Sequence, residues 1–104
     1  MYYSKHKRIY IISILKTKDY KTIIKKMCED KDSIFFFTSG NDKNRYVSKE
    51  NLYKEAKRYL NKDHINKEEL IDAIKIAQKY NDKAIFIIGS FYVYKTVCEV
   101  LKND

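Results

Sequence analysis

Short apolar runs alternate with segments of helical periodicity along this chain. Residues 9–15, 33–38 and 84–88 are almost continuously aliphatic or aromatic, as in strands that are covered on both faces. Between and after these runs, apolar residues recur three and four positions apart, which is the spacing of one helix face. The pattern predicts helices over about 18–29, 48–61 and 66–80 and after Ser90, with a brief edge strand at 62–64.

The alternation of strands and helices predicts the fold class. Such an order favours crossovers onto a mainly parallel sheet with helices on both faces, which is a three-layer α/β/α arrangement. Ligands of these folds bind near the carboxyl ends of the strands. The chain has no proline, and it contains no internal repeat or linker, so we expect one domain over residues 1–104.

Polar residues mark the expected starts of two helices. The hydroxyl of Ser48 is placed to accept a hydrogen bond from a first-turn amide of the second helix. Asn66 and Glu69 have the spacing of a capping box, and Ile65 and Leu70 occupy the flanking positions of a hydrophobic staple. We therefore expect the third helix to begin at Asn66.

The net charge of +8 raises the question of a nucleic-acid partner, because clustered basic residues bind phosphate backbones. Here the lysines are spread over every segment with acids among them, and only Arg8, Arg45 and Arg58 are arginine. This distribution is typical of solvated helix faces. Nucleic acid is therefore not the expected partner, although binding through the basic surface stays open as a third hypothesis.

The cysteines and the apolar runs indicate a cytoplasmic protein. Cys28 and Cys98 lie far apart and have no ligand pattern around them, so neither a disulfide nor a zinc site is expected. No apolar run approaches the roughly 20 residues that span a bilayer. Reduced thiols in the cytoplasm, with no membrane contact, are the expectation.

Gly89 and Ser90 form the most informative pair, because the third apolar run leads directly into them. Glycine permits a tight turn, and a serine at a helix start presents its hydroxyl and free amides toward an anion. A carboxylate or a phosphate could dock there, or Ser90 could simply cap its own helix. Neither G-x-G-x-x-G nor a Walker A sequence occurs, so a nucleotide fingerprint is excluded.

Three further residues are expected at the same edge of the sheet. Lys18 and Asp19 follow the first strand, although Asp19 could instead be a first-turn acid that the helix dipole favours. Arg45, in the loop after the second strand, has the geometry for a bidentate contact with a carboxylate or a phosphate, or is an ordinary exposed side chain. His6 and His64 fit no nucleophile or metal pattern, so we assign no catalytic and no metal-binding residue.

Taken in order, these segments resemble the C-terminal domain of folylpolyglutamate synthase, a Mur-ligase-type enzyme that is often also a dihydrofolate synthase. The family's strand leading into Asp-Lys-Asp is similar to residues 13–20, its strand ending in Thr to Thr38, and its loop arginine to Arg45. Its closing Gly-Ser-Leu-Tyr-Leu-Val-Gly is similar to Gly89-Ser90-Phe91-Tyr92-Val93-Tyr94-Lys95. The chain departs from the family pattern at Ser13, Thr17 and Lys95.

This resemblance implies a Rossmann-like sheet of the Mur-ligase C-terminal-domain type, without that domain's first strand and without the N-terminal P-loop ATPase domain. Enzymes of this family use ATP and Mg²⁺ to join L-glutamate to folates through an acyl phosphate, as part of one-carbon metabolism. The chain alone is expected to bind no cofactor and to be inactive. The resemblance assigns it a substrate-binding role, with contacts from Ser90, Gly89, Arg45, Lys18 and Asp19.

A second hypothesis is a degenerate stand-alone domain that has kept the fold for protein interaction or regulation. The genomic sequence distinguishes the two. A continuous upstream reading frame for a P-loop domain supports the ligase, whereas a genuine start codon at Met1 supports the stand-alone domain.

Overall fold

A computed structural model describes residues 8–80 and 82–89 of the chain. In this part, one sheet contains four parallel strands in the order β3-β2-β1-β4. The predicted α/β fold with a parallel sheet is confirmed. The strands are β1 (Arg8–Ile12), β2 (Ser33–Phe37), β3 (Ile65–Lys67) and β4 (Ala84–Ile88), and the α-helices are α1 (Tyr20–Met27), α2 (Lys49–Ala56) and α3 (Leu70–Ala77).

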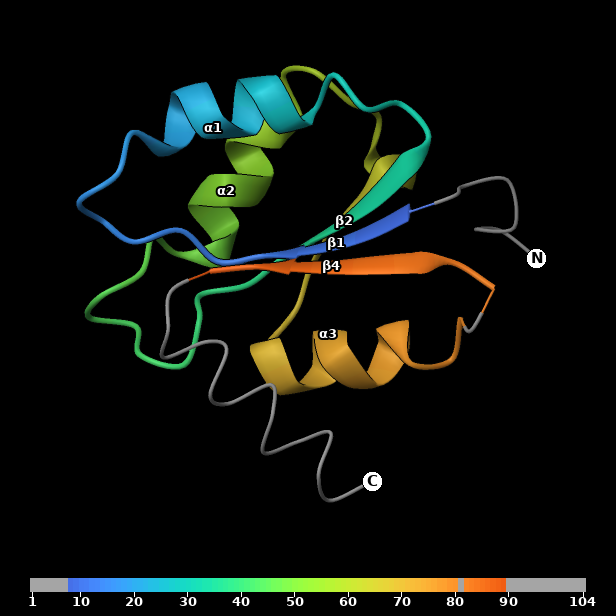
Figure 1. Cartoon of the computed structure of the whole chain (residues 1–104). Helices are drawn as coiled ribbons and strands as arrows, with labels where there is room; N and C mark the ends of the chain where they lie inside the picture. The colour runs from blue at the N-terminus through green and yellow to red at the C-terminus, as the bar shows by residue number, and fades with distance from the viewer. Residues whose placement is uncertain (1–7, 81, 90–104) are drawn as a thin grey trace.

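Helices cover both faces of the sheet, with α1 and α2 on one face and α3 on the other (Figure 1). Successive side chains of a strand point to opposite faces. Ile9 and Ile11 of β1 therefore pack in the core beneath α3, whereas Ile12 packs in the core beneath α1 and α2. Burial on both faces explains why β1 and β2 are continuous apolar runs rather than alternating ones. The prediction that residues 84–88 form a buried strand is wrong in one respect: β4 is a strand, but its side chains are exposed within the described residues, where it lies at the edge of the sheet and pairs with β1 alone.

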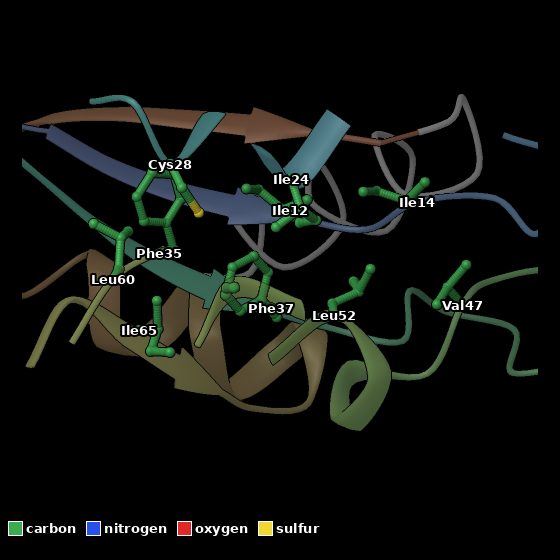
Figure 2. Close-up of a cluster of buried hydrophobic side chains, with 11 residues drawn as sticks. Ile12, Ile14, Ile24, Cys28, Phe35, Phe37, Val47, Leu52, Leu60 and Ile65 are labelled. Atoms are coloured by element: carbon green, nitrogen blue, oxygen red, sulfur yellow. The ribbon is translucent and has the colours of Figure 1, made fainter. Parts of the chain in front are cut away.

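The core beneath α1 and α2 is built on phenylalanine. Phe35 and Phe37 project from β2 toward Ile24 of α1 and Leu52 of α2, as Figure 2 shows. Cys28 packs in the same core, where burial raises the pKa of its thiol to about 11. This thiol is protonated at neutral pH and packs as a small apolar side chain.

The third helix begins later than the sequence pattern predicted. Asn66 lies on β3 and Glu69 is the residue before the helix, so the predicted capping box is wrong. The edge strand predicted at 62–64 is also wrong, because Lys62–His64 is a 3₁₀-helix. Ile65 is buried in the core beneath α1 and α2, whereas Leu70 is buried beneath α3. The sheet separates these two side chains, and they form no staple.

An ion-pair network joins the amino ends of β1 and β2. The Arg8 guanidinium donates from Nε and Nη2 to the two carboxylate oxygens of Asp30, each at 2.7 Å. The hydroxyl groups of Ser33 and Tyr10 donate to Oδ2 of the same carboxylate, at 2.6 Å and 3.2 Å. These donors, with Arg8 the largest cause, hold the pKa of Asp30 well below its usual range.

We expect Asp30→Asn to lower the free energy of unfolding by about 1–3 kcal/mol at neutral pH, because it leaves the donors around it poorly satisfied. The pKa of Asp30 is lower in the folded chain than in the unfolded chain, so its ionised form stabilises the fold above pH about 4. That contribution is lost as the pH falls further. Urea unfolding should therefore show the difference between wild type and variant shrinking from about pH 6 to about pH 2.

A matched control is Asp63→Asn, which neutralises an exposed acid on the 3₁₀-helix. It should change stability little at either pH. A difference between wild type and Asp30→Asn that stays constant over this pH range would contradict the assignment.

Candidate functional site

The carboxyl edge of the sheet contains a topological switch point between β1 and β4. From β1 the chain proceeds to β2 and β3 on one side, and then crosses back to β4 on the other side of β1. In open α/β sheets, ligands bind in the crevice at such a point. Figure 1 shows the loops that follow β1 and β2 at this edge, at the left of the view. A ligand-binding site is therefore expected among the residues that follow β1 and β4.

A cavity of about 290 Å³ lies at this switch point. Ile88 and Gly89 at the end of β4 line it, together with Ser13, Leu15 and Lys18 from the segment after β1. The walls are mainly apolar, and Lys18 is the charged residue among the described ones that line it. Such a cavity, at the small end of ligand pockets, fits a small molecule that carries an anionic group on a short apolar stem.

Buried hydroxyl groups fix the loops at this edge. The Ser13 and Thr38 hydroxyls, at the ends of β1 and β2, are hydrogen-bonded to each other. Thr38 Oγ1 also accepts from the Gly40 amide at 3.1 Å, and Ser39 Oγ accepts from the Lys49 amide at 2.8 Å. These hydroxyls hold the loop after β2 and the start of α2 against the sheet. Ser13 and Thr38 were both named from the family-like motifs, whereas Ser39 was not, although a polar residue directly after an apolar run is a sequence signal for such a position.

The loops after β1 and β2 are also joined through their backbones. Leu15 and Tyr46 form an isolated antiparallel bridge, and the Lys16 amide donates to the Arg45 carbonyl at 2.9 Å. The ring of Tyr46 is buried, and it packs against Gly40, whose φ is +67°. The two loops therefore behave as one unit that flanks the cavity.

The structure brings two of the predicted site residues together and gives a third a different contact. Lys18 and Gly89 line the same cavity. Asp19 is the N-cap of α1: its carboxylate accepts from the Thr22 amide at 3.3 Å and from the Thr22 hydroxyl at 2.6 Å. These hydrogen bonds lower the pKa of Asp19. The alternative that Asp19 is a helix-start acid therefore has direct structural support.

The other predicted residues lie away from the cavity or outside the described part. Arg45 is exposed on its loop, where its Nε lies 3.4 Å from Oδ2 of Asp42, and it is not among the residues that line the cavity. Ser90 and His6 lie outside the described residues. His64 lies at the opposite edge of the sheet, with Nδ1 3.4 Å from the carbonyl oxygen of Ser33.

Metal and nucleotide chemistry would require groups that the described residues do not assemble. Within residues 8–80 and 82–89, no three His, Cys, Asp or Glu side chains are placed to hold a metal ion. The two glycines of the chain are too few for a glycine-rich phosphate loop. In the same ranges, no helix has the length and apolar character to cross a membrane.

Comparison with solved structures relates this fold to part of a larger enzyme. Two structures of Mycobacterium tuberculosis folylpolyglutamate synthase, one complexed with ADP and one with ADP and AMPPCP, match it with TM-scores of 0.76 and 0.73. The aligned residues are 22% and 23% identical. Each alignment covers 94% of this chain but only 24% of the synthase chain.

The chain thus spans about a quarter of the length of these two synthase structures. No protein-family model and no curated protein sequence matches it. The structural match confirms the resemblance in fold that the motifs predicted, including the Rossmann-like α/β architecture.

Proposed function

We propose that this chain is the glutamate-binding domain of a cytoplasmic, ATP-dependent folylpolyglutamate synthase, and that it is inactive alone. The observation that carries the proposal is the cavity at the switch point, with Lys18 and Gly89 in its lining. Support comes from the fold shared with a quarter of the synthase chain and from the order of the family-like motifs. In the complete enzyme, the glutamate amine would attack an acyl phosphate of the folate.

The cavity suits the chemistry of L-glutamate. In the proposed complex the ammonium group of Lys18 pairs with one carboxylate, and backbone amides near Gly89 donate to the other. The apolar walls from Leu15 and Ile88 contact the methylene groups. Because Lys18 is exposed and water competes for its ammonium group, we expect the isolated chain to bind glutamate only with a Kd of about 1 mM or weaker.

The proposal leaves ATP, Mg²⁺ and the folate to the rest of the enzyme, as the N-terminal P-loop domain of the resemblance implies. This chain would position the incoming glutamate at the edge of the sheet. Its described residues provide neither a cluster of metal-binding side chains nor a phosphate loop, so we assign no step of ATP chemistry to them.

An NMR titration of the chain tests this proposal. L-glutamate should shift the backbone amide resonances of Gly89 and Leu15 more than D-glutamate does. Lys18→Ala should weaken the binding about threefold to tenfold, because it removes the cation of the cavity. Lys25→Ala removes an equal charge in the last turn of α1 and should leave the affinity unchanged. The absence of selective shifts at high millimolar L-glutamate would contradict the proposal and favour a domain that has kept only the fold.

A further inference from the structure

Further cavities lie beside α1, α2 and the loops that follow β1 and β2. Two cavities, of about 380 Å³ and 230 Å³, share the lining residues Tyr20 and Asn51. The larger is bounded by the loops after β1 and β2, and the smaller by α1 and α2 themselves, which pack against each other (Figure 1). The two cavities are adjacent at Tyr20 and Asn51, and we call them together the α1–α2 trough.

The trough is lined by cations at both ends. Among its described lining residues Glu55 is the acid, and its side chain is only 9% exposed and is paired with Arg58 at 2.9 Å. The lysines of the trough form no ion pair within the described residues, whereas Lys49 nearby is paired with Glu50 and Glu69. The cations that line the trough are Lys16, Lys43, Lys21, Lys54 and Arg58.

Five cations facing one neutralised carboxylate give the trough a positive potential. The walls of a cleft exclude water and focus the field of the charges that line it, which raises the local concentration of anions. Glu55 and Arg58 largely cancel each other, so the four lysines carry the excess charge. An anionic ligand that spans both cavities would approach all four.

We propose that the α1–α2 trough binds an extended acidic peptide. Its carboxylates would pair with Lys16 and Lys43 at one end and with Lys21 and Lys54 at the other, and the amide group of Asn51 would donate between them. This surface is separate from the switch-point cavity, and the inference goes beyond the proposed function and does not depend on it.

The side chains of the trough favour a peptide over a nucleic acid. Base stacking requires accessible aromatic faces, but Tyr46 is buried and Tyr20 is packed against the core. Arginine is the residue that matches phosphate bidentately, and Arg58 is already engaged with Glu55 and with the ring of Tyr59, 5.7 Å away. The free cations are lysines, whose point charges pair readily with single carboxylates.

Fluorescence anisotropy of the full chain with a short labelled oligoglutamate peptide, at low ionic strength, tests the inference. Lys21→Glu with Lys54→Glu should weaken binding about tenfold or more, since both lysines become repulsive. Lys16→Glu with Lys43→Glu, at the other end, should weaken it similarly. The matched control is Lys75→Glu with Lys79→Glu, which changes the net charge equally on the α3 side and should alter the affinity less than about twofold.

Two results would overturn the inference. Equal losses in the trough variants and the control would show that the peptide senses only net charge, and tighter binding of a single-stranded DNA of equal charge would identify a nucleic-acid surface. Urea midpoints of all variants verify that they fold. The L-glutamate shifts at Gly89 should persist in the trough variants, so a failure of this inference and a failure of the proposed function are distinguishable.

Discussion

Replacing Gly40 with alanine is expected to lower the free energy of unfolding by about 2–4 kcal/mol. Gly40 has φ +67°, a left-handed conformation that costs an alanine about 1–2 kcal/mol. A Cβ at this position would also overlap the ring of Tyr46, lying 2.6 Å from its Cγ. Since this ring is 1% exposed and packs in the core beneath α3, it has little room to move.

Urea unfolding measures this loss, and a second substitution separates its two causes. In a Tyr46→Ala background both Cγ and the ring are absent, so Gly40→Ala should cost only the backbone part, about 1–2 kcal/mol. Asn44→Ala, an exposed substitution in the same loop, serves as the control and should change stability by less than about 0.5 kcal/mol. A loss for Gly40→Ala no larger than that of the control would contradict the steric account.

Phe35→Ala is expected to destabilise the chain by about 3–5 kcal/mol, the range for removing a buried phenylalanine ring. Phe35 is fully buried on β2, an inner strand of the sheet. Its ring stacks on Tyr10 at 5.2 Å and on Phe37 at 6.0 Å between centroids. The cavity left by the ring lies in the centre of the core beneath α1 and α2, where rigid strands prevent collapse.

A small domain is commonly stable by about 5–15 kcal/mol, so this variant should unfold at a much lower urea concentration than the wild type. Phe35→Leu keeps most of the apolar volume and should cost only about 1–1.5 kcal/mol. The two variants together report on ring volume rather than on tolerance of the strand to substitution. Equal midpoints for them would show that the ring does not support this core.

Local sequence determined the strands β1, β2 and β4 and the start of α2. β1 and β2 are covered on both faces, and each appears in the sequence as a continuous apolar run. β4 is also a continuous apolar run, although its side chains are exposed within the described residues. The start of α2 depends on a contact within one turn, because Ser48 Oγ accepts from the Asn51 amide at 3.1 Å. A cap of this kind is visible in the sequence itself.

Only the tertiary structure decided β3 and the start of α3. Ile65 and Leu70 have the spacing of a staple, but spacing does not state which face of a sheet each side chain reaches. Pairing with β2 draws the three residues Ile65–Lys67 into the sheet, and this long-range pairing outweighs the local capping signal at Asn66.

For the candidate site too, part was predictable from the sequence and part depends on the tertiary structure. Lys18 and Gly89 were predicted at one edge because the carboxyl ends of parallel strands meet there, a consequence of topology that the alternating pattern already implies. In contrast, the α1–α2 trough joins Lys21 and Lys54 from helices that are distant in sequence. In the sequence, these two lysines resemble ordinary solvated side chains on a helix surface. Their shared positive field exists only because two crossovers place α1 and α2 side by side on the same face of the sheet.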